Sequence, residues 1–295
     1  MEQLADGLGW PEGPTRLADG SCVFVESYRS QLTIWTPGEG VSCYAYTAGA
    51  PNSCVLGAAG EIYLCQNGGT VGPWRADEMT HPSIQVVPER GARAEIIVTE
   101  IEGVKLNGPN DLVFGPDGSL YFTDPGTYDP ASPEPSYIFA LAPDGSGRLV
   151  VEFEQPTFPN GLAFDRDGNL VWVESYTGRV KRRLPDGTRE DLGRLPGDNP
   201  IPDGMTFDAK GRMYVTDIAG GGLHVLDHDG TTVGFHPIEG NPTNCTFDEQ
   251  TLFVTDAGRL ADGPEPSLHG RLWRLDVGIH GQETSVGSIG AAAKT

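Results

Sequence analysis

The sequence predicts an all-β protein, specifically a six-bladed β-propeller with four-stranded antiparallel blades. Three observations predict it: the 295 residues include 41 glycines and 24 prolines, one hairpin motif recurs six times, and successive copies start 40 to 58 residues apart. Glycine and proline interrupt long helices but suit short strands joined by turns. Four-stranded propeller blades repeat at about 40 to 50 residues. Arranged radially, such blades bury their faces and leave no long open edges.

Each copy of the motif reads as proline, a polar residue, an apolar strand, a turn and a second strand. In the first five copies a glycine, from Gly20 to Gly211, lies nine residues after the proline, which predicts hairpins of nearly fixed register. The sixth copy is one residue shorter and lacks this glycine. Segments such as QLTIWTPGEG and YIFALAPDGSG then read as third strands. The six copies are PEGPTRLADGSCVFVE from Pro11, PNSCVLGAAGEIYLCQ from Pro51, PNDLVFGPDGSLYFTD from Pro109, PNGLAFDRDGNLVWVE from Pro159, PDGMTFDAKGRMYVTD from Pro202 and PTNCTFDEQTLFVTD from Pro242.

We expect a single propeller domain over residues 1–295, with motif-bearing blades starting near residues 10, 50, 108, 158, 201 and 241. The longest interval predicts an insertion at about residues 69–104, which contains Trp74, Arg75 and His81. A shorter insertion, PGTYDPASPEPS, follows Asp124. Long connections in a compact repeat fold are either functional loops or surface excursions, and the sequence leaves both readings open.

Charge and apolar patterning restrict the partners. The chain carries 20 basic and 41 acidic residues, a net charge of −21, which repels nucleic-acid phosphates and anionic lipid surfaces. The first twenty residues lack a basic, apolar leader, and no apolar run reaches about 18 residues. We therefore expect a soluble, cytoplasmic protein without nucleic-acid or membrane partners. The odd number of cysteines and the absence of a C-x-x-C pair predict buried free thiols at Cys22, Cys43, Cys54, Cys65 and Cys245.

A ring of polar residues is predicted at one mouth of the central channel. The residue after each motif proline starts an inner strand, and in a propeller these starts converge around the axis. Singly, Pro-Asn and Pro-Asp are ordinary turn formers, but six equivalent polar positions indicate a site. The set offers oxygen donors and contains no His or Cys. Its members are Glu12, Asn52, Asn110, Asn160, Asp203 and Thr243.

The two carboxylates of this ring predict a cation. Glu12 and Asp203, facing each other across a narrow channel, would raise each other's pKa unless a cation lay between them. One divalent ion neutralises both carboxylates, and amide oxygens complete its shell without further charge. Oxygen-only ligation favours Ca²⁺, leaves Mg²⁺ and Mn²⁺ as alternatives and suits Zn²⁺ less well.

Several motifs resemble those of the senescence-marker-protein, gluconolactonase and regucalcin family of six-bladed propellers. They are WPEGP, NGPNDLVFGPDGSLYFTDP, FPNGLAFDRDGNLVWVES, PDGMTFDAKGRMYVTD and PTNCTFD, in family order from about Trp10 to Val277. Members of that family are metal-dependent lactonases. The resemblance implies that Asp203 is the general base and that Asn110 lies at a substrate position that also contacts the metal in related phosphotriesterase-like propellers. It implies metal ligands at Glu12, Asn160 and Asp203.

We therefore expect hydrolysis of a lactone ring, most simply a 1,5- or 1,4-lactone of a sugar acid. A divalent metal would polarise the carbonyl, and Asp203 would accept the proton of the attacking water. Asn110, Asn52 and Tyr128 are the expected substrate contacts. The same site could instead accept an organophosphate, an aryl ester or a non-sugar lactone, and a non-catalytic calcium-binding propeller is the third reading.

Other positions carry weaker signals. The loop residues Trp74, Tyr176 and His269, with Tyr128, could set substrate preference, although loop aromatics usually serve packing. His224 and His228 are four residues apart but flank a strand and a turn, which disfavours a zinc site. The second copy has Ser53 after Asn52 where the family more usually has glycine. In the sixth copy either Thr243 or Asn244 could face the site, and the oligomeric state and exact lactone stay open.

Overall fold

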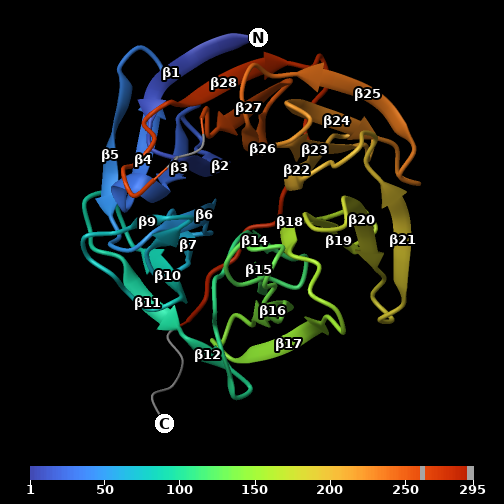
Figure 1. Cartoon of the computed structure of the whole chain (residues 1–295), viewed down its shortest axis with the longest axis horizontal. Helices are drawn as coiled ribbons and strands as arrows, with labels where there is room; N and C mark the ends of the chain where they lie inside the picture. The colour runs from blue at the N-terminus through green and yellow to red at the C-terminus, as the bar shows by residue number, and fades with distance from the viewer. Residues whose placement is uncertain (260–262, 291–295) are drawn as a thin grey trace.

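The computed structural model describes residues 1–259 and 263–290 and confirms the predicted six-bladed β-propeller. Six four-stranded antiparallel sheets stand radially around a central channel (Figure 1). Within the described residues the only helical element is the 3-10 turn η1, Ser27–Arg29. In those same residues no helix has the length and apolar character needed to cross a membrane.

In each of the first three blades the inner strand is followed outward by three more strands. The first blade comprises β2 (Pro11–Arg16), β3 (Cys22–Glu26), β4 (Gln31–Thr36) and β5 (Gly40–Tyr46). The second comprises β6 (Pro51–Leu56), β7 (Ile62–Gln66), β10 (Ser83–Val87) and β11 (Glu95–Val98). The third comprises β14 (Leu112–Phe114), β15 (Leu120–Asp124), β16 (Tyr137–Leu141) and β17 (Gly147–Glu152).

The last three blades repeat this order, except that the sixth takes its outermost strand from the beginning of the chain. The fourth comprises β18 (Pro159–Phe164), β19 (Leu170–Glu174), β20 (Arg179–Arg183) and β21 (Arg189–Arg194). The fifth comprises β22 (Pro202–Phe207), β23 (Met213–Asp217), β24 (Gly222–Leu226) and β25 (Thr232–Pro237). The sixth comprises β26 (Pro242–Asp248), β27 (Thr251–Asp256), β28 (Gly270–Asp276) and β1 (Glu2–Leu8).

The hairpin turns follow the predicted register. The glycine nine residues after the motif proline has a left-handed backbone in the first five copies, with φ of 82° at Gly20 and 76° at Gly118, for example. A glycine adopts this conformation without the steric cost that a Cβ would add. The sixth copy lacks the glycine, and Glu249 in its turn has a φ of 52° instead.

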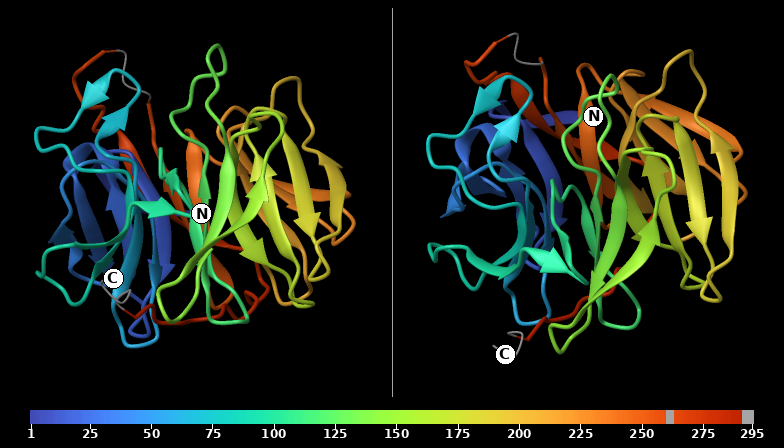
Figure 2. Two further views of the ribbon diagram at one scale, coloured as in Figure 1. Left: turned by 90° about the horizontal axis from the view of Figure 1, so that it is seen from below. Right: turned by 60° about the horizontal axis from the view of Figure 1, so that its bottom comes forward.

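The predicted insertion at residues 69–104 is corrected. β10 and β11 lie within this range, yet they are the third and fourth strands of the second blade. The additional residues form two short hairpins, β8–β9 (Thr70–Val71 and Trp74–Arg75) and β12–β13 (Glu100–Ile101 and Val104–Lys105). Figure 2 shows the β8–β9 hairpin, in cyan, projecting at the end of the propeller opposite the C-terminal segment. The spacing of the repeats did not reveal this, because the two hairpins lengthen the second blade without changing its four strands.

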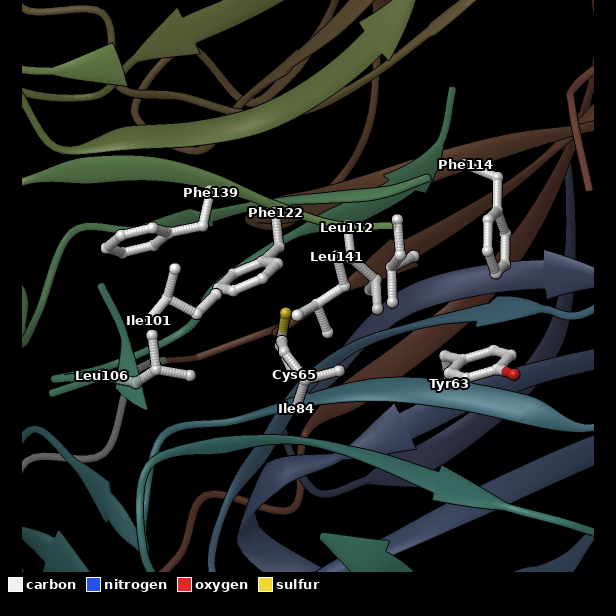
Figure 3. Close-up of a cluster of buried hydrophobic side chains, with 11 residues drawn as sticks. Tyr63, Cys65, Ile84, Ile101, Leu106, Leu112, Phe114, Phe122, Phe139 and Leu141 are labelled. Carbon is white, nitrogen blue, oxygen red and sulfur yellow. The ribbon is translucent and has the colours of Figure 1, made fainter. Parts of the chain in front are cut away.

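The hydrophobic core is divided into clusters between neighbouring blades. Six clusters each join two adjacent sheets, and the one between the last and first blades contains Leu8, Phe24 and Phe253. Figure 3 shows the cluster between the second and third blades, where the Tyr63 and Phe114 rings lie 5.4 Å apart. Side chains on both faces of each sheet are thereby removed from water, which is the main stabilising contribution.

A C-terminal segment crosses the far end of the channel. After β28, residues 278–290 run beneath the blades, and the red trace in Figure 2 follows this path. The backbone N–H groups of Gln282 and Gly290 donate to Phe207 O at 2.9 Å and Pro143 O at 2.9 Å. The segment therefore connects the fifth blade to the third and covers the channel end opposite the motif prolines.

Candidate active site

A cavity of about 370 Å³ lies at the channel mouth where the inner strands begin. Five of the six predicted ring residues line it, and Tyr128 joins them from the loop after β15. Five inner strands start at the motif proline, so the next residue is the second of the strand in these blades, whereas β14 starts at Leu112, two residues after Asn110. The lining ring residues are Glu12, Asn52, Asn110, Asn160 and Asp203.

In five of the six blades, a buried polar side chain at the end of the second strand accepts a hydrogen bond from the backbone that leads into the ring. The Asp217 Oδ1 accepts a hydrogen bond from Ile201 N at 2.9 Å, directly before Pro202. Likewise, Asp256 Oδ1 accepts a hydrogen bond from Asn241 N at 2.8 Å, directly before Pro242. A buried carboxylate that accepts backbone N–H groups fixes the approach of the chain. Glu174 occupies the equivalent position in the fourth blade but accepts from Trp172 Nε1 and Thr177 Oγ1 instead. The six equivalent positions, which the sequence did not indicate, are Glu26, Gln66, Asp124, Glu174, Asp217 and Asp256.

A belt of six hydrogen bonds, one at each blade junction, surrounds the channel at the level of the ring. Each is donated by a side chain of one blade to a main-chain carbonyl at or beside the ring position of the next blade. Buried bonds of this kind cost more to lose than they contribute on average, because the acceptor is left without water. They are Ser27 Oγ to Pro51 O (2.7 Å), Asn52 Nδ2 to Asn110 O (3.3 Å), Thr123 Oγ1 to Asn160 O (3.0 Å), Ser175 Oγ to Pro202 O (2.7 Å), Thr216 Oγ1 to Thr243 O (2.8 Å) and Thr243 Oγ1 to Pro11 O (2.8 Å).

A second layer of polar side chains lies one residue further along the inner strands. Asp111 accepts hydrogen bonds from Ser53 Oγ at 2.6 Å and from Asn244 Nδ2 at 3.3 Å. Glycine occupies the equivalent position in three blades and makes room for these side chains, because a Cβ on Gly13 or Gly204 would collide with Ser53 or Asn244 respectively. Neither candidate of the sixth copy lines the cavity: Asn244 Nδ2 donates to Asp111 beneath the ring, and Thr243 Oγ1 donates to Pro11 O.

The site concentrates negative charge away from water. Glu12, Asp111 and Asp203 are buried, and none of them takes part in an ion pair found among the described residues. Burial, followed by the charges of Asp203 and Asp111, raises the pKa of Glu12 well above its usual range. Burial and then Asp111 raise the pKa of Asp203 to about 8, although hydrogen bonds with Asn160 and Glu12 oppose the rise. A cation beside these groups would favour their ionised forms.

The donor set fits a hard divalent cation. Glu12 and Asp203 supply carboxylates, and Asn160 supplies a carboxamide whose Nδ2 donates to Ser175 Oγ at 3.1 Å, which leaves its oxygen available. Oxygen donors of this kind suit Ca²⁺ or Mg²⁺. In residues 1–259 and 263–290, no group of three or more His, Cys, Asp or Glu side chains is arranged to hold an ion.

Two groups of aromatic side chains stand at the cavity mouth. On one side the Tyr28 ring lies 5.7 Å from that of Trp10 and 5.2 Å from that of Trp74, at the base of the β8–β9 hairpin. On the other side, three rings pack together within 5.0 to 5.2 Å of one another: Tyr128, Phe158 and Tyr176. Trp74 itself is buried and supports the hairpin, whereas Trp10, Tyr28, Tyr128 and Phe158 line the cavity.

The remaining sequence candidates lie outside the cavity. His269 lines a separate surface depression, and the exposed Arg75 donates to the carbonyls of its own hairpin. His224 is buried against Asp217 at 3.2 Å, whereas His228 is exposed beside Asp227.

All five cysteines are free, as predicted, but Cys43 is exposed. The prediction of burial is therefore wrong for this residue. It lies on β5, the outermost strand of the first blade, where neighbouring sequence does not determine exposure.

Comparison with known proteins agrees with the arrangement. Residues 10–258 match the model of the SMP-30/Gluconolactonase/LRE-like region. The chain belongs to this family. A gluconolactonase of Zymomonas mobilis is 31% identical over 288 residues, covering 86% of this chain and 78% of the relative. A pentonolactonase of Haloferax volcanii is 30% identical over 192 residues, covering 59% and 64% of the two chains.

A solved structure from the same family has the same fold. It is a gluconolactonase of Xanthomonas campestris, with a TM-score of 0.72 and 25% identity over 93% of this chain and 88% of that one. The family match begins at Trp10 and includes all six ring positions up to Thr243. The residues that line the cavity thus lie largely within the family match, and both relatives named above are lactonases.

Proposed function

We propose that this protein is a metal-dependent lactonase that opens the ring of a sugar-type lactone. The gluconolactonase and pentonolactonase relatives support a lactonase. The observation that carries the proposal is the convergence of two buried carboxylates and three carboxamides on one cavity, at positions that the repeat makes equivalent. Glu12, Asn160 and Asp203 would hold the cation, with Asn110 as a further candidate ligand.

Asp203 is the proposed general base. When bound, a divalent cation supplies Lewis-acid polarisation of the lactone carbonyl and stabilises the charge that develops on its oxygen. Asp203 lines the cavity and is buried, so its carboxylate can accept a proton from a water that shares the cavity with the substrate. A nearby cation lowers the raised pKa of this carboxyl and keeps it in the basic form at neutral pH.

The remaining lining side chains orient the lactone. The Asn52 Nδ2 is directed to the Asn110 backbone at 3.3 Å, which leaves its oxygen to accept a substrate hydroxyl. Asn110 lines the cavity with both a donor and an acceptor. Tyr128 is 45% exposed, and burial together with the charges of Tyr176 and Asp203 raises the pKa of its phenol, which therefore remains a hydrogen-bond donor. Together these groups bind and align the ring for attack.

The test combines metal removal with one substitution. The protein is stripped with a chelator, dialysed and assayed by acid release from glucono-1,5-lactone, with and without Ca²⁺, Mg²⁺, Mn²⁺ or Zn²⁺. We expect activity to disappear on stripping and to return with one of these ions. Asp203→Asn should lower kcat by about 100-fold or more, in the range for a lost general base. Asp186→Asn, on an exposed turn, is the matched control.

Other results would change the assignment. Full activity after exhaustive chelation, or in Asp203→Asn, would refute the mechanism. Faster turnover of paraoxon or phenyl acetate than of any lactone would move the substrate to an organophosphate or aryl ester. Tight Ca²⁺ binding without turnover of any of these compounds would indicate a non-catalytic calcium-binding propeller.

A further inference from the structure

The cavity lining combines an acidic floor with walls that carry no positive charge. Its lining residues all belong to the described chain and include no Lys, Arg or His. Glu12 and Asp203 are its acidic members. The remaining polar members are amides and hydroxyls, and the upper part is formed by aromatic and aliphatic side chains. The apolar lining includes Trp10, Val71, Pro73, Phe158, Ile201 and Ile218.

The backbone is strained at the two aromatic residues that enter the cavity from opposite blades. Trp10 and Phe158 both have a φ of 54°, and each directly precedes a motif proline. A left-handed conformation is unfavourable for a bulky residue, and a following proline restricts the residue further. Such outliers persist when the surrounding structure holds them in place, and they cluster at functional sites. Here the strain directs two aromatic rings into the cavity from the first and fourth blades.

We propose that this cavity selects uncharged lactones and holds an apolar face or substituent of the substrate between two walls, Trp10 with Tyr28 and Tyr128 with Phe158. The inference rests on the proposed lactonase function and adds the substrate class. The tight ring packing on each side, 5.7 Å for Trp10 with Tyr28 and 5.0 Å for Tyr128 with Phe158, keeps the walls in place before substrate binds. Preformed apolar surface of this kind favours ligands that bury carbon.

Charge explains the exclusion of anionic lactones. Glu12 and Asp203 line the cavity, and the carboxyl group of Asp111 is buried beneath the ring, where it accepts from Ser53 Oγ. A phosphate or carboxylate on the substrate would enter a partly desolvated site that has no side-chain cation to pair with it. A neutral lactone avoids this penalty. Its product acquires a carboxylate, which no Lys or Arg of the described lining retains, so the same charge distribution favours product release.

A panel of six-membered lactones tests the substrate class with the metal-loaded protein. We expect kcat/KM for 6-phosphoglucono-1,5-lactone to be at least tenfold below that for glucono-1,5-lactone. Among neutral compounds, the alkyl chain of δ-decalactone should lower KM relative to unsubstituted δ-valerolactone. Equal or faster turnover of the phosphorylated lactone, or no benefit from the alkyl chain, would overturn the inference while leaving the lactonase function intact. No turnover of any lactone would instead refute the function and the inference together.

Two pairs of variants localise the effect. Ile218→Lys places a cation on the cavity wall, and Ile218→Gln is its uncharged control. We expect the lysine variant alone to raise the ratio of kcat/KM for phosphorylated over neutral gluconolactone by tenfold or more. Tyr128→Ala should raise KM for δ-decalactone more than for δ-valerolactone, whereas Tyr128→Phe keeps the ring and should not. An unchanged ratio in Ile218→Lys, or an equal effect of Tyr128→Ala on both lactones, would contradict the assigned walls.

Discussion

The Thr243 Oγ1 donates a 2.8 Å hydrogen bond to Pro11 O and thereby joins the last inner strand to the first. Thr243 Oγ1 also lies 2.9 Å from Thr255 Oγ1, and both threonines are buried. The bond completes the belt around the channel at the residue directly before Glu12. Thr243 therefore does not line the cavity but holds the backbone of Pro11, which directly precedes Glu12.

Removing this hydroxyl should loosen the ring closure. Thr243→Val keeps the side-chain shape but leaves Pro11 O without its buried donor, so we expect the free energy of unfolding to fall by about 1–3 kcal/mol. Thr243→Ser retains the hydroxyl and should lose distinctly less. Urea denaturation followed by tryptophan fluorescence measures both. A larger loss in Thr243→Ser than in Thr243→Val would assign the effect to packing of the methyl group instead.

The glycines of the second layer are predicted to be required for space. A Cβ on Gly204 would overlap the Asn244 side chain, which in turn donates to Asp111 at 3.3 Å. Gly204→Ala should therefore displace Asn244 and reduce stability by about 1–3 kcal/mol, as overpacking usually does. Gly234→Ala is the control, because its Cβ would make only ordinary contacts with Val225. Thermal unfolding of both variants decides whether the space is needed.

Repeat spacing was sufficient to predict the fold and five of the residues that line the cavity. The prolines mark the starts of inner strands, so a single register places Glu12, Asn160 and Asp203 at equivalent points. That geometric equivalence follows from the repeat and needs no long-range information. Their roles as metal ligands stay predictions, as does the role of Asp203 as base.

The parts that the sequence did not predict depend on contacts between blades. Asp111 follows Asn110 directly, but its burial depends on Ser53 and Asn244, which come from two other blades. Trp10 lines the cavity. It directly precedes a motif proline, but the sequence around it does not show that its ring enters the cavity. The predicted bounds of the insertion were wrong for a related reason. β10 and β11 belong to the second blade because β10 pairs with both β7 and β11, and the local sequence does not show this pairing.

Asp124 should make stability depend on pH. This buried carboxylate accepts hydrogen bonds from Gly108 N at 2.7 Å and Asn107 N at 3.0 Å, yet burial raises its pKa to about 6. The folded protein therefore binds a proton more tightly than the unfolded chain, whose Asp titrates near 3.8. The stabilisation by this proton is complete below about pH 4 and is lost as pH rises through about 6.

Asp124→Asn isolates that contribution. The amide oxygen can still accept from the two backbone N–H groups, but it does not titrate. The difference in unfolding free energy between wild type and variant should change by on the order of 2 kcal/mol between pH 4 and pH 7, with wild type relatively less stable at pH 7. Chemical denaturation across this range measures it. If the difference in unfolding free energy did not change with pH, the pKa of the Asp124 carboxyl would not be raised in the folded state.

Cation binding should be visible as stability, independently of turnover. A ligand that binds only the folded state stabilises it by about 2.7 kcal/mol at 100 times its Kd. We expect Ca²⁺ to raise the Tm of the chelator-treated protein and Glu12→Gln to abolish most of that increase. Glu39→Gln removes the same charge from an exposed turn, and this variant should retain the increase in Tm with Ca²⁺. An undiminished increase in Glu12→Gln would place the ion elsewhere.

The C-terminal segment should contribute to closure of the propeller from the face opposite the cavity. Its backbone bonds Phe207 O in the fifth blade and Pro143 O in the third, and Ile289 N donates to the Tyr63 hydroxyl at 2.8 Å. Truncation after Val277 removes these links and exposes the channel end, so Tm should fall by several degrees, because each kcal/mol is worth about 2–4 °C in a chain of this size or slightly smaller. Since the ring lies at the other mouth, Ca²⁺ should still raise the Tm of the truncated protein. Loss of that response together with the fall in Tm would instead mean that the segment supports the arrangement of Glu12 and Asp203.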